Sequence, residues 1–261
     1  MKTMLNLLKV SLFAFGLGST AHAADLSEIL SSGVVKIAVP ESFAPFGSIG
    51  AGGEHEGYDV DVAKLIAKDL GVKLELIPVV SKQRIPFLET DRVDLVISTM
   101  GANPSRAKSI NFSSAYAPFY SGIFAPSTTD ISSPVDLSGM TVGVTGGSLE
   151  DLEITDAAPD DAKIVRFGDN AATLSAFTSG QVQVLVTGNT AAASLTDADP
   201  GLDLERKYII KDSPCFIGVK KGNEDLLRWV NVFILHKKLG GELNAISQKW
   251  LGQNLPPLPS L

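Results

Sequence analysis

Residues 93–113, VDLVISTMGANPSRAKSINFS, decide the fold that the sequence predicts. The run VDLVIS is short, apolar and rich in β-branched residues, which is typical of a buried strand. Asn103-Pro104 is typical of a helix start, and it places Arg106 in the first turn. A strand end with bare N–H groups, the Thr99 hydroxyl and a nearby guanidinium make a pocket for a planar anion, above all a carboxylate. The alternative is an ordinary turn with Arg106 in solvent.

The residues before this stretch alternate between strands and helices. Strands are predicted at 34–39 and 72–79, with an amphipathic helix at 59–70 between them and a further helix at 84–90. This order predicts βαβ units and a parallel sheet, and such sheets bind ligands outside the carboxyl ends of their strands. On or just after such ends lie Phe43, Ser81, Arg84, Thr99 and Arg106.

The second half of the chain repeats the α/β pattern. It follows residues 126–129, PSTT, which suit a crossing between lobes. A strand at 140–144 leads to a turn with Gly147 and Ser148 at a helix start. Bare N–H groups and a hydroxyl there predict a second anion site, and the alternative is a plain serine cap. Near 214–219 the chain returns to the first unit.

Length, composition and the N-terminus indicate an exported globular protein. The chain has 261 residues, 44% of them hydrophobic, enough for one large domain or two of ordinary size. Lys2 and Lys9 flank an apolar run, and Ala21-His22-Ala23 is typical of signal-peptide cleavage, so we expect residues 1–23 to be removed. The sole cysteine, Cys215, cannot form an internal disulfide. The bacterial periplasm is the expected location.

The charge and the polar residues exclude several classes of function. Loss of two lysines with the signal takes the formal charge from −7 to −9, which disfavours nucleic acid as a partner. The mature histidines lack metal-ligand spacing, and no Gly-x-Ser-x-Gly elbow occurs. The acid pairs are expected to be solvated acids at helix starts rather than catalytic dyads: Asp59/Asp61 and Glu150/Asp151. We therefore expect no catalytic residue, no metal and no cofactor.

An ordered set of stretches resembles the periplasmic solute-binding proteins of ABC transporters, in the polar amino-acid branch known as family 3. The set covers nearly the whole mature chain and comprises SFAPF at 42–46, GYDVDVA at 57–63, RIP at 84–86, 93–106, INFS at 110–113, 143–148 and KWLG at 249–252. The resemblance implies a two-lobed α/β fold of type II, each lobe a mainly parallel sheet flanked by helices. Two crossing strands would join lobe 1, residues 24–124 and 216–261, to lobe 2, residues 125–215, and the lobes would close like a hinge.

The resemblance also assigns the ligand contacts by position. It makes Arg106 the clamp for an α-carboxylate, helped by the N–H of Gly101 and by Ser148 next to Gly147. It makes Phe43 the aromatic that packs on the ligand and Thr99 a polar contact. Ser81 and Arg84 match the place where relatives that bind glutamate or aspartate hold the side-chain carboxylate. The alternative for Arg84 is an ion pair with Glu89 or Asp91 on its own short helix.

Two departures from the family pattern concern the ligand's charges. Gly101 replaces a common Thr or Ser, and Gly188 stands where relatives carry an Asp that pairs with the ligand's ammonium group. Asn189, Glu41 or another acid would take that role, or the ligand has no α-ammonium. Two arginines without the Asp give a formal charge of +2, which favours a dianion.

The expected function is that of the solute-binding component of an ABC importer. The partners are a small ligand, either a polar or acidic amino acid or a dicarboxylate, and a membrane permease; the protein is expected to be a monomer. The alternative is a secreted dehydratase of the same fold that acts on a prephenate-like diacid, although no general acid is identified for it.

Overall fold

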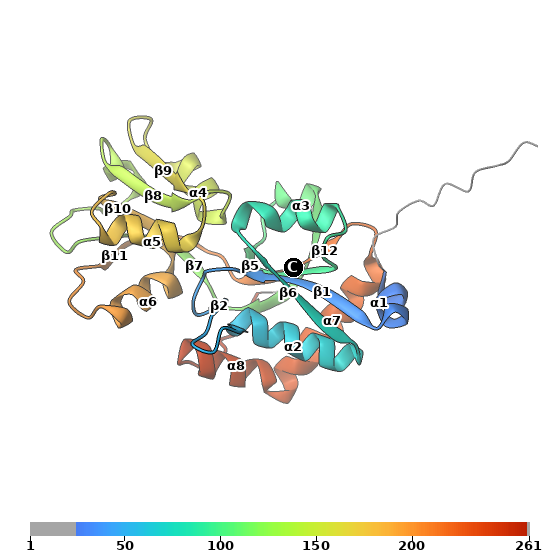
Figure 1. Cartoon of the computed structure of the whole chain (residues 1–261). Helices are drawn as coiled ribbons and strands as arrows, with labels where there is room; N and C mark the ends of the chain where they lie inside the picture. The colour runs from blue at the N-terminus through green and yellow to red at the C-terminus, as the bar shows by residue number, and fades with distance from the viewer. Residues whose placement is uncertain (1–24, 260–261) are drawn as a thin grey trace, which may run out of the picture.

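A computed structural model describes residues 25–259, whose elements form two lobes side by side (Figure 1). The predicted signal segment, residues 1–23, lies outside the described residues. Within 25–259, no helix is long and apolar enough to cross a membrane.

The first lobe is built on a five-stranded sheet. Its strands are Val34–Pro40 (β1), Lys73–Val79 (β4), Leu95–Gly101 (β5), Ile110–Ala117 (β6) and Cys215–Lys220 (β12). They lie in the order β4-β1-β5-β12-β6. The helices of this lobe are Leu26–Ser32 (α1), Tyr58–Leu70 (α2), Arg84–Glu89 (α3), Glu224–Gly240 (α7) and Glu242–Leu251 (α8). A two-stranded hairpin, Ser48–Ile49 (β2) with His55–Glu56 (β3), closes the loop after β1.

The apolar pattern of the sequence explains this lobe. β5 is buried along its whole length, and β1 is buried over Ile37–Pro40 and pairs with it in parallel. On α2 the residues Val62, Ile66 and Leu70 share one buried face, and the helix packs on β1, β4 and β5. Gly71 ends the helix in the left-handed conformation, at φ 70°. The carboxyl ends of β1, β4 and β5 therefore meet at one edge, as the sequence predicts.

The second lobe has its own five-stranded sheet, in the order β11-β7-β10-β8-β9. Its strands are Tyr120–Ala125 (β7), Thr141–Thr145 (β8), Lys163–Phe167 (β9), Val184–Gly188 (β10) and Glu205–Asp212 (β11). The helices are Leu149–Ala157 (α4), Asn170–Thr178 (α5) and Asn189–Ala198 (α6). Three short 3₁₀ turns complete the described chain: Ser81–Gln83 (η1), Arg106–Lys108 (η2) and Pro134–Leu137 (η3).

Both sheets are mixed rather than mainly parallel, which corrects one detail of the expected fold. In the first sheet β12 runs antiparallel to β5 and β6, and in the second β7 runs antiparallel to β10 and β11. The reason is that β7 and β12 are the strands with which the chain enters each lobe from the other. The polypeptide crosses at 118–119 and returns at 213–214. Residues 120–124, expected in lobe 1, thus hydrogen bond within the second sheet as part of β7.

Candidate functional site

A cavity of about 260 Å³ lies where the two lobes meet, at the carboxyl ends of the first lobe's strands. Four of the residues that the sequence predicted for the site line it: Ser81, Arg84, Arg106 and Gly147. Lys82, Ile85 and Met100 complete the lining. Gly147 belongs to the second lobe, so the cavity is formed by both halves of the molecule.

Arg106 is held at the cavity by its backbone and by two carbonyl groups. The Asn103 side chain accepts a hydrogen bond from the Arg106 N–H at 2.7 Å. The helix predicted from Asn103-Pro104 does not form: only the 3₁₀ turn η2 follows, and its cap residue is Ser105. The guanidinium donates to Gly101 O at 2.9 Å and, across the lobes, to Gly147 O at 3.1 Å. Burial and the neighbouring Arg84 lower the pKa of Arg106 to about 10, so it is charged at neutral pH. Three of its five N–H groups are left for a ligand.

Gly101 and Gly147 bring the lobes into contact. A Cβ atom on Gly101 would lie 2.4 Å from both Leu149 Cδ2 and Ser213 Oγ. Gly147, at φ 77°, would place a Cβ 3.1 Å from Lys82 Cβ of the first lobe. A side chain at Gly101 would require the ends of Leu149 and Ser213 to shift, and one at Gly147 would meet the backbone of Lys82 as well as its side chain. The missing side chain at Gly101 therefore has a structural reason. The structure is a closed arrangement of the two lobes.

Ser148 lies beside this contact and begins α4. Its Oγ accepts a hydrogen bond from the Asp151 N–H at 3.1 Å, which is the serine cap that was weighed as the alternative. The hydroxyl hydrogen can still be donated to a ligand, so the cap and a ligand contact are compatible.

Arg84 and Ser81 are buried polar groups that lack partners in the described part of the chain. Arg84 is 5% exposed, and neither its Nε nor Ser81 Oγ has a hydrogen-bond partner among residues 25–259. The alternative ion pair with a local acid is wrong for this structure, because Asp91 pairs with Lys220 at 2.7 Å and Glu89 is exposed. Burial lowers the pKa of Arg84, as expected for a cation removed from water without an ion pair.

Thr99 is held by a buried hydrogen-bond network at the end of β5. Its φ is 46°, a left-handed conformation that a β-branched residue adopts only when the surroundings enforce it. The backbone N–H and the hydroxyl of Thr99 both donate to Asp59 Oδ2, at 2.7 and 2.9 Å, and Tyr116 donates to Asp59 Oδ1 at 2.6 Å. The hydroxyl hydrogen is therefore used inside the protein, and this network fixes the end of β5.

Asp59 is one of three acids that sequence reasoning wrongly placed in solvent at a helix start. It is completely buried beneath the site. Burial raises its pKa to about 6, while the hydrogen bonds from Tyr116 and Thr99 act in the opposite direction. The Gly-Tyr-Asp motif at 57–59 was part of the family resemblance, and it was the signal that could have identified a buried structural acid.

Glu150 on α4 was also expected in solvent, together with Asp151, and both are buried. Asp151 pairs with Arg166 at 2.8 Å. Glu150, 8% exposed, has no ion pair or hydrogen bond to another residue of 25–259. Its charge partly offsets the burial that lowers the pKa of Arg84 and of Arg106. Glu150 thus acts electrostatically on both guanidinium groups, and no sequence pattern beyond the helix start indicated it.

Phe43 and Asn189 do not line the cavity. The Phe43 ring packs against Phe46 and Phe119, with centroids 6.0 and 6.2 Å apart. Asn189 Oδ1 accepts a hydrogen bond from the Tyr120 N–H at 3.1 Å, and the residue lines a separate cavity of about 210 Å³ in the second lobe. Its carbonyl oxygen is therefore already used.

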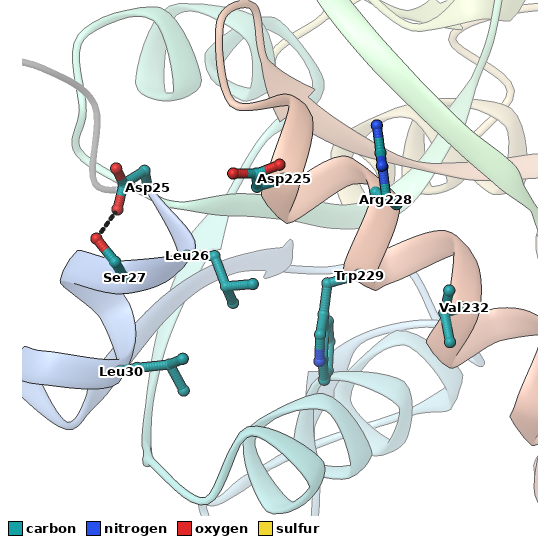
Figure 2. A pocket seen from close by; sticks show the side chains of 8 residues that line it. All are labelled: Asp25, Leu26, Ser27, Leu30, Asp225, Arg228, Trp229 and Val232. Carbon is teal, nitrogen blue, oxygen red and sulfur yellow. Dashed lines mark hydrogen bonds between the residues drawn. The ribbon is translucent and has the colours of Figure 1, made fainter.

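A larger groove, of about 530 Å³, lies between α1 and α7, away from these charged residues (Figure 2). Figure 2 shows Leu26 and Leu30 of α1 facing Trp229 of α7 across it. Its lining is mainly apolar, and no residue predicted for the site belongs to it. In residues 25–259 no group of three or more His, Cys, Asp or Glu side chains could hold a metal ion.

Comparison with known proteins identifies a match over most of the chain. The family model described as "Bacterial extracellular solute-binding proteins, family 3" matches residues 35–253. The ABC transporter glutamine-binding protein GlnH of Bacillus subtilis is 32% identical over 206 residues, which cover 77% of this chain and 75% of that protein.

Two solved structures share the fold. The solute receptor for L-cysteine of Neisseria gonorrhoeae superimposes with a TM-score of 0.82 at 30% identity, covering 87% of this chain and 94% of the receptor. An ancestral amino acid-binding protein, described as a precursor of cyclohexadienyl dehydratase, gives a TM-score of 0.78 at 30% identity, covering 86% and 98%.

Proposed function

Because this chain belongs to the bacterial extracellular solute-binding proteins, family 3, we propose that it binds a small amino acid between its two lobes and delivers it to the membrane permease of an ABC importer. It is an extracytoplasmic binding protein and not an enzyme. The dehydratase alternative finds no support among the relatives described above, since even the dehydratase precursor is named an amino acid-binding protein.

The observation that carries the ligand class is the pair of buried guanidinium groups. Arg84 and Arg106 line one cavity, and neither forms an ion pair within residues 25–259. Removing such a cation from water costs several kcal/mol unless an anion compensates it. A carboxylate held by two parallel N–H bonds is the anion that best matches a guanidinium.

We assign the ligand's α-carboxylate to Arg106, with the Gly101 N–H and the Ser148 hydroxyl as further donors, and the far end of its side chain to Arg84 and Ser81. The two ends of the cavity then suit an amino acid whose side chain ends in an acceptor group, a carboxylate or an amide. Thr99 and Phe43 support the site from behind rather than contacting the ligand, through the Asp59 network and the aromatic cluster.

The charge around the cavity includes groups that sequence reasoning left out. That reasoning counted two arginines and no acid, a charge of +2; Lys82 also lines the cavity, and Glu150 acts on both guanidinium groups, so these four side chains again sum to +2. This charge favours an acidic ligand over a basic one. L-glutamate and L-glutamine are our candidates, and the Bacillus subtilis relative is named for glutamine.

The remaining assignments are part of the same proposal. We place the hinge at the crossings 118–119 and 213–214, and we expect a monomer that reaches the periplasm after cleavage of residues 1–23.

A thermal-shift panel tests the ligand class. It compares glutamate, glutamine, aspartate, lysine, arginine, glutarate and glucose with the purified protein. The proposal predicts the largest stabilisation by glutamate or glutamine. Stabilisation by glucose alone would refute a carboxylate ligand, and stabilisation by lysine or arginine alone would refute the assignment of Arg84 to the ligand's side chain.

A further inference from the structure

The outward side of α7 carries apolar residues that the rest of the described chain leaves uncovered. Val232, Leu235 and Leu239 are 61, 59 and 79% exposed. Their spacing places them on one side of the helix, opposite the buried Val230. A surface helix with one buried face normally presents polar residues to water, so a second apolar side indicates an interaction surface. We define the α7 stripe as these three exposed residues together with Arg228.

Two grooves border the α7 stripe, one on each side. The first is the groove of about 530 Å³ between α1 and α7, where Leu30 faces Trp229 (Figure 2). The second has a volume of about 540 Å³ and includes Ser114 of β6 in its lining. Arg228 and Val232 line both grooves, so the stripe forms the ridge between them. A ridge with grooves at its sides is the surface with which one helix packs on another.

The two ends of α7 carry opposite charges beside the stripe. Glu224 and Asp225 lie in the first turn, whereas the basic His236 and Lys238 lie near the end. Glu224 accepts a hydrogen bond from the Asn111 side chain at 2.9 Å. None of the four charged or basic side chains forms an ion pair within 4.0 Å among residues 25–259. The outward side of α7 is therefore acidic at its start, apolar in the middle and basic at its end.

A second α7 in antiparallel orientation matches this pattern. With a two-fold axis near Asn231, Glu224 lies opposite the partner's Lys238, and Asp225 lies opposite the partner's His236. The first two residues share one flank of the stripe and the second two share the other, and equal flanks meet in an antiparallel pair. The apolar residues of the two stripes then meet between the charges, and the two helix dipoles oppose each other favourably.

We propose that the α7 stripe is the interface between two copies of this chain, with their α7 helices antiparallel. Such an interface uses the same surface on both chains and closes after two copies. The inference revises one part of the proposed function, since the expected monomer becomes the dilute form of a weak dimer. Because α7 belongs to the first lobe and no residue of the stripe lines the cavity between the lobes, each copy keeps its own cleft.

Two other occupants suit the stripe less well. A membrane surface attracts helices with basic flanks, whereas Glu224 and Asp225 are acidic and the chain has a formal charge of −7. A permease that detects closure has to contact both lobes, and the stripe lies on one.

Sedimentation equilibrium over a range of protein concentrations tests the dimer. We expect the mass of the parent protein to rise from that of one chain towards that of two. Leu235→Glu should weaken this association roughly tenfold or more, because it places a charge in the apolar centre of the interface. Val135→Glu is the matched control, since Val135 is 65% exposed on η3 of the second lobe. Both variants should unfold in urea and bind ligand as the parent does.

Single cysteines and charge reversals test the antiparallel arrangement. Val232→Cys lies near the axis and should form a disulfide with its copy under mild oxidation, whereas the buried Cys215 should not react. Leu239→Cys lies on the same stripe, but its two copies would be about 24 Å apart along the helices and should not cross-link. Glu224→Lys and Lys238→Glu should each weaken the dimer, and the double variant should restore it.

Three results would each overturn the proposal. The parent protein could remain a single chain up to about 1 mM. Leu235→Glu could associate as the parent does, or Leu239→Cys could cross-link as readily as Val232→Cys. None of these measurements uses a ligand, so their failure leaves the proposed solute binding standing, and a failed ligand panel leaves the dimer standing.

Discussion

Replacement of Arg106 by alanine and by lysine tests the proposed carboxylate clamp. In the structure Arg106 is 92% buried, and its guanidinium donates to one carbonyl of each lobe, Gly101 O and Gly147 O. Alanine removes the positive charge and both hydrogen bonds. Lysine keeps the charge but cannot present two parallel N–H groups to a carboxylate.

The expected magnitude follows from burial. Removing one partner of a buried, hydrogen-bonded charge pair costs about 2–5 kcal/mol in binding, which corresponds to roughly 30-fold to several thousand-fold in Kd. Alanine should lie in the upper part of this range, because it also removes the Arg106–Gly147 bond that joins the lobes in the closed arrangement. Lysine should retain part of the affinity.

Isothermal titration calorimetry with the amino acid preferred in the panel measures both variants. Arg92→Ala is the control, because Arg92 is an exposed arginine of the same lobe that stacks on Phe87, 3.8 Å from its ring centroid. Chemical denaturation shows whether each variant is folded. The reasoning is refuted if folded Arg106→Ala binds with the affinity of the parent, or if Arg92→Ala loses as much.

Three further predictions concern closure, the buried acid and the thiol. Gly101→Ala should weaken ligand binding by about 1–3 kcal/mol, because its Cβ would lie 2.4 Å from Leu149 Cδ2 across the closed cleft. The control Gly168→Ala, whose Cβ would meet nothing within 4 Å, should bind normally. Equal affinities of Gly101→Ala and the parent protein in calorimetry would contradict this prediction. Asp59→Asn should lower the free energy of unfolding by about 1–3 kcal/mol in urea titrations. An amide has one acceptor oxygen, so it cannot accept the hydrogen bonds of both Thr99 and Tyr116. Burial raises the pKa of Asp59 from 3.8 to about 6, so between these pH values the folded protein holds a proton that the unfolded chain releases. The contribution of this group to stability is therefore present below pH 4 and is lost as the pH rises through about 6. Asp59→Asn should lack that part of the pH dependence of stability, and a profile identical to the parent's would disprove the prediction. Cys215 is buried, and burial raises the pKa of its thiol. A thiol reagent should therefore label it only when denaturant unfolds the first lobe. Rapid labelling of the native protein would contradict this prediction.

The fold could be predicted because its signals are local and repeated. The sequence predicts a strand at 93–98 and an amphipathic helix at 59–70; the structure has β5 at Leu95–Gly101 and α2 at Tyr58–Leu70, so the helix bounds agree within one residue and the strand bounds within three. The order of strand, helix and strand then fixes which ends meet at one edge. The direction of β7 and β12 could not be read in this way, because it depends on where the chain crosses between lobes and not on any local pattern.

The site could be predicted only in part, because sequence position does not reveal burial. Arg84 and Arg106 reach one cavity, as expected from their places after strand ends. Asp59 and Glu150 look like ordinary acids in the first turn of a helix, where solvent exposure is the usual state, and only the packed structure shows that both are buried. A Cβ on Gly188 would overlap the ring of Phe119, a residue 69 positions away, and no local pattern connects the two.

The most direct measurement of the central claim is the identification of the bound solute. Freshly purified protein is denatured, the released small molecules are identified by mass spectrometry, and the compound found is titrated back into refolded protein by calorimetry. We predict an α-amino acid with a carboxylate or amide side chain that binds one to one and loses affinity in Arg106→Ala. A one-to-one complex with a solute that has no carboxylate, unaffected by Arg106→Ala, would contradict the account.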